Sequence, residues 1–305
     1  MRLAIIFTLT SLSLVACGDD GGGTTPDASA VDIGFNPPTV TLKANEEVAD
    51  DQWMEVGDAD LSCLNTASDD VASTVAVTLT TKVTDFQSGN AVPNAMVEVF
   101  KDQDYMNVEA TATSDQNAMV SLDLPVGVKR FGYRMTSSSS LPTFLLNQTL
   151  PSPTEMMQTV GNIQSVSNAT AQTLPALIGQ TRTVGTGVVA GALRDCQGRE
   201  ISGFIATMSS TKGEANTVMG ADTYYFDSSV GLPVHHNRQA YASGDGLFMI
   251  IEIPSSAPTG YVQMWGFPTA ADMQMGKDGL KLIAELQVPV LPDTVITGSY
   301  EPLRN

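Results

Sequence analysis

Hydrophobic and polar residues alternate with a period of two along several stretches after position 75. In residues 75–84, four aliphatic side chains and one threonine occupy the odd positions, while the even positions carry mainly threonine. Successive side chains of a strand point to opposite faces and β-branched residues favour strands, so this pattern predicts a half-buried strand. Further strands are expected over 92–100, 120–124 and 130–135, separated by turn residues. Short strands at such regular spacing predict a β-sandwich.

The same order of strands and turns recurs in the second half of the chain. Strands are expected over 187–193, 201–208 and 249–253, and another over 282–288. The strands over 120–124 and 249–253 are each stopped by a proline.

An internal repeat accounts for this recurrence. Asp85 matches Asp195 at an offset of 110 residues. Pro125 matches Pro254 at an offset of 129, so the second copy holds 19 additional residues. They fall between 208 and 240. Copies of this length are domains rather than short solenoid repeats.

The turns and strands of both copies resemble the carboxypeptidase regulatory-like, transthyretin-like β-sandwich family. In the first copy, the residues that carry the resemblance are Thr84-Asp85 with Gly89, the stretch 92–97, and the stretch from 113–115 through 124–127. In the second copy, they are Asp195 with Gly198 and the stretch from 243–248 through 253–254. The resemblance implies immunoglobulin-like sandwiches that serve exported proteins as accessory modules. It implies no peptidase activity, since a fold does not carry chemistry.

The predicted fold class is therefore all-β, with two transthyretin-like β-sandwich domains in tandem. The first is expected over 57–150 and the second over 186–305, with an inserted loop near 213–240. Residues 151–185 connect them and are expected to hold a short helix, because Ser and Thr caps and a terminal Gly occur at 167–179.

The first seventeen residues resemble the signal and lipobox of bacterial lipoproteins. One arginine precedes a short apolar stretch that ends in Leu-Val-Ala-Cys at positions 14–17. The resemblance implies removal of the signal peptide 1–16 and attachment of a diacylglycerol to the thiol of Cys17. Residues 17–56 are then a Gly- and Asp-rich tether with a poorly defined continuation. Gly18, not an aspartate, follows the cysteine, which favours the outer membrane.

Composition and charge narrow the function classes. The chain of 305 residues is 42% hydrophobic and 16% charged, which allows a sizeable core and excludes wholesale disorder. With 33 acidic and 15 basic residues, the net charge is −18. Unspecific nucleic-acid binding rests on Lys and Arg, so no nucleic-acid partner is expected.

Cys63 and Cys196 are the two cysteines that remain after Cys17 is assigned to lipid. In an exported chain they are expected to form one disulfide. The alternative is two free thiols.

His235 and His236 are the only histidines, and both fall in the additional residues of the second copy. The expected arrangement is two exposed loop histidines, without metal or cofactor. Neighbouring residues on a strand point to opposite faces, but on a loop both could reach one metal, with Asp222 or Asp227 as a third ligand. No metal-binding spacing and no Gly-x-Ser-x-Gly motif supports catalysis, so no catalytic residue is assigned.

Tyr261, Trp265 and Phe267 share one face of an expected strand, opposite Val262 and Met264. Either the aromatic side chains are core, which the burial habits of such residues favour, or they form an exposed binding surface.

The sequence therefore predicts a non-catalytic protein of the bacterial envelope, lipid-anchored and acting as a structural or partner-binding module. The expected partners are the membrane and an envelope protein or polysaccharide, contacted through 213–240. One alternative is a metal-dependent hydrolase that uses His235 or His236. Another is a carbohydrate- or peptide-binding protein that uses the aromatic residues Tyr261, Trp265 and Phe267.

Overall fold

The computed structural model describes residues 36–49, 52–171, 180–227, 232–256 and 259–305. They are almost entirely strands and connecting loops, which confirms the all-β fold class. Seven strands correspond to predicted stretches: β3 (Val77–Asp85), β4 (Met96–Lys101), β6 (Met119–Leu124), β7 (Arg130–Ser137), β11 (Thr186–Leu193), β16 (Leu247–Pro254) and β18 (Lys281–Pro289).

The predicted strand over 201–208 is two strands, β12 (Glu200–Ser202) and β13 (Ile205–Ser209). The break lies at Gly203, whose φ is +83°. A side chain there would be strained, and its Cβ would lie 2.7 Å from the Thr41 carbonyl oxygen. The glycine therefore lets the chain leave one sheet and enter another.

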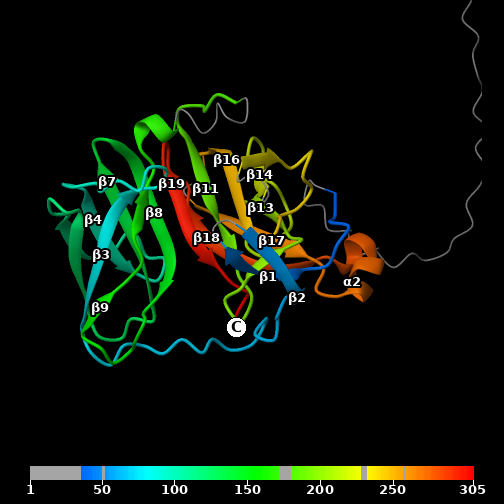
Figure 1. Ribbon diagram of the computed structural model, residues 1–305, viewed down its shortest axis with the longest axis horizontal. Coiled ribbons are helices and arrows are strands. Elements are labelled where there is room, and N and C mark those ends of the chain that lie inside the picture. Colours follow the sequence, from blue (N-terminus) through cyan, green and yellow to red (C-terminus); the bar gives the residue numbers. More distant parts are fainter. Residues whose placement is uncertain (1–35, 50–51, 172–179, 228–231, 257–258) are drawn as a thin grey trace, which may run out of the picture. The chain divides into compact units, whose positions relative to one another are not determined.

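One sheet of nine strands runs through both halves of the chain in the order β15-β14-β16-β11-β19-β8-β7-β4-β5 (Figure 1). Its remaining members are β5 (Val108–Thr113), β8 (Ser140–Thr149), β14 (Asp222–Asp227), β15 (Leu232–His235) and β19 (Val295–Tyr300). β19 pairs in parallel with both β8 and β11, so it joins the two halves. The two halves thus share a sheet, and their repeat relationship and their independence as folding domains stay predictions.

Smaller sheets cover this large sheet and enclose two hydrophobic cores. In the first half, β3 pairs with β6, β9 (Met157–Thr159) and β10 (Ile163–Ser165). Hydrophobic side chains of β3, β6 and β10 pack with those of β4 and β7. In the second half, β17 (Thr259–Gly266) pairs with β13 and β18. This sheet packs against β11, β14, β16 and β19.

The connecting segment 151–185 also contributes two strands to the first small sheet. β9 and β10 both pair in parallel with β3 and complete the first small sheet. A helical turn follows over 168–171, and the Ser167 hydroxyl accepts a hydrogen bond from the Thr170 backbone N–H at its start. The rest of the predicted helix, 172–179, lies outside the described residues.

Cys63 and Cys196 form the predicted disulfide. Cys196 lies in the turn after β11, and its backbone N–H donates to the Asp60 carbonyl. The preceding strands β1 (Lys43–Ala49) and β2 (Gln52–Asp58) form a sheet with β12. The disulfide therefore ties the amino-terminal part of the described chain to the second half.

The short helices α2 (Ala270–Gln274) and η1 (Gly276–Gly279) connect β17 to β18. Within the described part of the chain, no helix combines the length and the apolar character needed to cross a membrane.

Candidate functional site

The hairpin of β14 and β15 lies in the stretch that the sequence predicts as an insertion, and it brings polar side chains together at one end of the nine-stranded sheet. Tyr224 pairs with His235 across the hairpin, so their side chains share a face. Asp222 lies two residues before Tyr224 and therefore lies on the same face. His236 follows in the turn after the strand.

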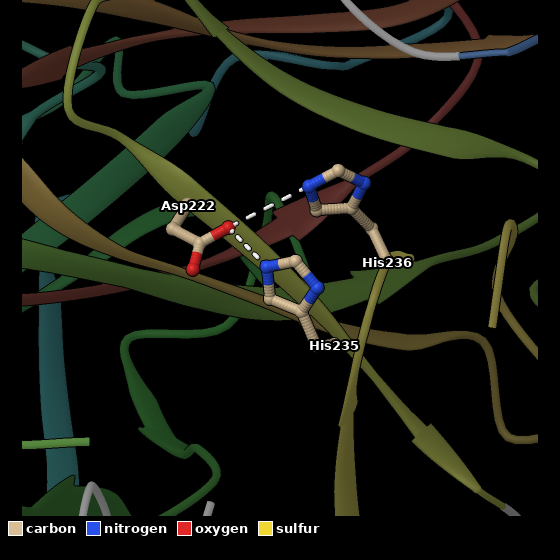
Figure 2. A group of neighbouring side chains, drawn as sticks. All are labelled: Asp222, His235 and His236. Carbon is tan, nitrogen blue, oxygen red and sulfur yellow. Dashed lines mark hydrogen bonds and ion pairs between the residues drawn. The ribbon is translucent and has the colours of Figure 1, made fainter. Parts of the chain in front are cut away.

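Asp222 contacts both histidines through one carboxylate oxygen (Figure 2). Its Oδ1 lies 2.8 Å from His235 Nε2 and 3.6 Å from His236 Nε2. The two imidazole rings are 4.3 Å apart and tilted by 37°. One ligand atom from each of the three residues lies within 4.8 Å of the other two.

The predicted arrangement of two exposed loop histidines is wrong. His235 ends β15, and His236 lies beyond it, so the alternation of a regular strand does not separate their rings. The side chains of His235, His236 and Asp222 are 27%, 23% and 29% exposed, so each is half-buried but reachable from solvent. Of the two acids considered as a third ligand, the structure selects Asp222. Asp227 lies at the other end of β14.

Tyr224 holds the second carboxylate oxygen of Asp222. Its hydroxyl donates to Asp222 Oδ2 at 3.1 Å, and its ring packs edge-on against His235 with centroids 5.1 Å apart. Burial and the charge of Asp222 raise the pKa of Tyr224 to about 12, so the hydroxyl stays a donor at neutral pH. Sequence reasoning missed this residue because its role depends on strand register.

The environment of His236 disfavours its charged form. Burial, followed by the neighbouring His235, lowers the pKa of His236, and Asp222 only partly opposes this. The His235 ring is oriented from its other side, since the Asn237 backbone N–H donates to His235 Nδ1 at 3.2 Å. Two imidazoles thus face one carboxylate.

The same sheet face continues into an apolar surface. Asp222 pairs with Ile251 of β16, and Tyr224 pairs with Met249. Ile251 and Met249 line a cavity of about 110 Å³ together with Val188, Ala190 and Phe226. The polar cluster therefore borders an apolar cavity.

The aromatic residues proposed as a binding surface do not form one. Trp265 and Phe267 are 5% and 1% exposed and pack with Leu280, and only Tyr261 is half-buried. Val262 and Met264 on the opposite face are also fully buried. β17 is thus covered on both faces, and the interpretation as core holds for Trp265 and Phe267.

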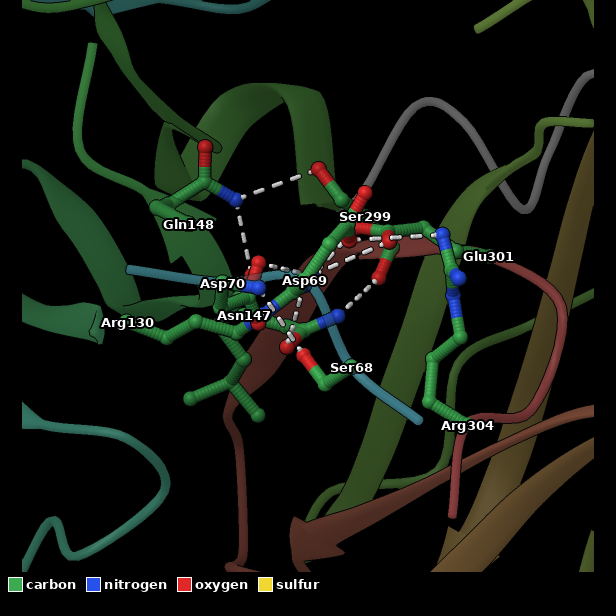
Figure 3. Close-up of polar contacts among 10 residues, drawn as sticks. Ser68, Asp69, Asp70, Arg130, Asn147, Gln148, Ser299, Glu301 and Arg304 are labelled. Carbon is green, nitrogen blue, oxygen red and sulfur yellow. Dashed lines mark hydrogen bonds and ion pairs between the residues drawn. The ribbon is translucent and has the colours of Figure 1, made fainter. Parts of the chain in front are cut away.

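A second polar cluster, centred on Arg130, joins segments that are distant in sequence (Figure 3). Nε and Nη2 of Arg130 donate to the carboxylate of Asp70, and Nη1 and Nη2 donate to Glu301. Nη1 also donates to the Asn147 side chain at 3.0 Å. Burial opposes the charge of Arg130, but the hydrogen bonds to Glu301 and Asp70 raise its pKa above the usual value. No local sequence signal marks this cluster.

Neither a protein-family model nor a curated protein matches the chain. Among solved structures, the chain is similar to the shaft pilin SpaA from Lactobacillus rhamnosus GG, at 11% identity and a TM-score of 0.22 over 76% of this chain and 98% of the pilin. It is also similar to the Bacillus anthracis TIE protein, at 11% identity and a TM-score of 0.24 over 75% of this chain and 34% of that one. Likeness at these scores carries no conclusion about function.

Proposed function

We propose that the protein is a non-catalytic, lipid-anchored protein of the bacterial envelope that acts as a structural or partner-binding β-sandwich module outside the cytoplasm. The motif Leu-Val-Ala-Cys at 14–17 supports the anchor. The observation that carries the proposal is the Cys63–Cys196 disulfide, because such bonds persist in oxidising compartments and are rare in the cytosol.

The proposed anchor is a diacylglycerol on Cys17, in the outer membrane. A single acyl chain gives marginal membrane binding, whereas two or more, at about 0.8 kcal/mol per buried CH₂, give a durable anchor. The lipid then holds the protein on a membrane, and no helix among the described residues could span one. Cys17 lies outside the described residues, so the anchor rests on the sequence motif.

The proposed contact surface for an envelope protein or polysaccharide is the region 213–240, which contains the β14–β15 hairpin. The observation behind it is that the additional residues of the second copy gather there, and insertions on a repeated scaffold commonly carry function. β15 is the terminal strand of the nine-stranded order, and its Leu232 side chain is 49% exposed.

Lipidation is tested by expressing the full chain in a bacterium with lipoprotein processing. Mass spectrometry of the membrane-extracted protein should find acylated Cys17 as the first residue. The variant Cys17→Ala should be unacylated and should leave the membrane fraction. As a matched control, the double variant Cys63→Ala/Cys196→Ala should still be acylated. An unacylated wild-type protein with residues 1–16 intact would overturn the proposal.

A further inference from the structure

We propose that Asp222, His235 and His236 bind one divalent transition-metal ion of the zinc class, in a site with three protein ligands and an open coordination position. This inference goes beyond the proposed envelope function and does not depend on lipid anchoring.

The donor set suits such an ion. Zinc is bound in proteins by imidazole nitrogen and carboxylate oxygen at about 2.0–2.2 Å, and sites with three protein ligands leave one position for water or another ligand. Imidazole nitrogen suits zinc, copper and nickel better than magnesium or calcium, which prefer oxygen ligands. Two imidazoles with one carboxylate therefore favour a transition metal.

The spacing of the donor atoms also suits it. Tetrahedral coordination at the bond lengths above places ligand atoms about 3.3–3.5 Å apart. The two Asp222 Oδ1 distances, 2.8 Å to His235 and 3.6 Å to His236, lie on either side of that value. Small side-chain movements would complete the geometry, because one ligand atom of each residue already lies within 4.8 Å of the other two.

Tyr224 supports the site from behind. Metal-binding carboxylates are commonly held by hydrogen bonds to their other oxygen, and these outer contacts orient the ligand. The Tyr224 hydroxyl occupies Oδ2 of Asp222 and leaves Oδ1 directed toward the two imidazoles. The buried Tyr224 is itself fixed by the strand pairing with His235.

Metal binding through Nε2 requires a change in the tautomer of His235. Its Nδ1 accepts the Asn237 N–H, so in the metal-free state Nε2 carries the proton and donates to Asp222. A metal on Nε2 needs that lone pair, so the proton moves to Nδ1 with no net release. The hydrogen bond from Asn237 is then lost. Metal binding therefore has a local signature at the Asn237 amide.

The test uses the full chain carrying Cys17→Ala, kept oxidised so that Cys63 and Cys196 offer no thiolate. After dialysis against EDTA, zinc chloride is titrated by calorimetry, and the complex is weighed by native mass spectrometry. One zinc per chain is expected. Asp222→Asn, His235→Gln and His236→Gln should each weaken binding about 100-fold or more, and Tyr224→Phe about 10-fold.

Asp227→Asn, at the other end of the same strand, is the matched control and should leave zinc affinity unchanged. Nuclear magnetic resonance should show the Asn237 amide among the largest zinc-induced shifts, and circular dichroism verifies the fold of each variant. If a variant does not fold, the Asn237 shift in the wild-type protein still decides. No stoichiometric zinc, or binding that persists in all three ligand variants, would overturn the proposal. Neither result bears on the acylation of Cys17.

Discussion

Replacement of Arg130 by methionine removes a guanidinium that holds three distant segments together. Arg130 begins β7, Asp70 lies in the segment before β3, and Glu301 follows β19. The guanidinium offers five N–H donors, and all five are used on Asp70, Glu301 and Asn147. Methionine keeps the apolar stem but leaves two carboxylates without their cation.

The expected cost follows from burial. Removing one partner of a fully buried ion pair costs about 3–5 kcal/mol, whereas exposed pairs are worth about 0–1 kcal/mol. The side chains of Arg130, Asp70 and Glu301 are 16%, 18% and 31% exposed, which places this cluster between the two cases. We expect Arg130→Met to lower the free energy of unfolding by about 2–3 kcal/mol. For a chain of 305 residues, that lowers the melting temperature by about 3–5 °C.

The effect should fade in acid. Burial raises the pKa of Asp70, but the hydrogen bonds from Arg130 outweigh it and hold the pKa below the usual value. A lowered folded-state pKa stabilises the protein above the ordinary pKa of aspartate, near pH 4, and that stabilisation is lost as the pH falls through the folded value. The difference between wild type and variant should therefore be full at pH 7 and shrink below pH 4.

Urea unfolding followed by tryptophan fluorescence and circular dichroism measures the difference. Arg134→Met is the matched control on the same strand, because Arg134 forms one ion pair, with Glu98, whose two side chains are 31% and 14% exposed. We expect the control to cost about 1–2 kcal/mol, less than Arg130→Met, because it leaves one carboxylate without a cation instead of two. Equal costs for the two variants, or a cost at Arg130 that persists unchanged at pH 3, would refute the reasoning.

Two further predictions concern stability. The double variant Cys63→Ala/Cys196→Ala opens a loop with a sequence separation of 133. The chain-entropy model then gives a loss of at most about 5 kcal/mol in the free energy of unfolding. A urea midpoint equal to that of the oxidised wild type would contradict this prediction. Burial raises the pKa of Asp245 to about 6, so the stability that this carboxyl contributes is present below pH 4 and lost as the pH rises through 6. Asp245→Asn should therefore gain about 1–2 kcal/mol over wild type between pH 5 and 7.5, and parallel pH profiles would count against this assignment.

The alternation of hydrophobic and polar residues predicted the strands, because a strand that is buried on one face imposes this pattern on residues that are neighbours in the sequence. The pattern of 75–84 became β3, buried on the side that carries Val77, Leu79 and Val83. Alternation does not tell whether the second face of a strand is also covered. In β17 the register shifts between Met264 and Trp265, and residues beyond the strand bury Trp265. The aromatic surface was wrong for that reason.

Long-range pairing was beyond local patterns. The sequence predicts two domains but gives no sign that β19 pairs in parallel with strands of both halves. Arg130 finds partners 60 and 171 residues away, which no spacing rule connects. The disulfide was predictable because elimination left a single pair of cysteines. At the hairpin, the residues Asp222, His235 and His236 could be identified from the sequence, but the contact of Asp222 with both imidazole rings depends on where β15 ends.

The two adjacent tyrosines of β14 show why the metal site and the fold can be perturbed separately. Tyr225 points into the second core, is fully buried, and its hydroxyl accepts the Ala206 backbone N–H at 3.0 Å. Tyr224 points to the opposite face and donates to Asp222. The alternation of a strand thus assigns one tyrosine to packing and the next to the polar cluster. Substitutions at Asp222, His235 or His236 should therefore leave the second core intact, and lost zinc binding in a variant with the wild-type circular dichroism spectrum would report on coordination.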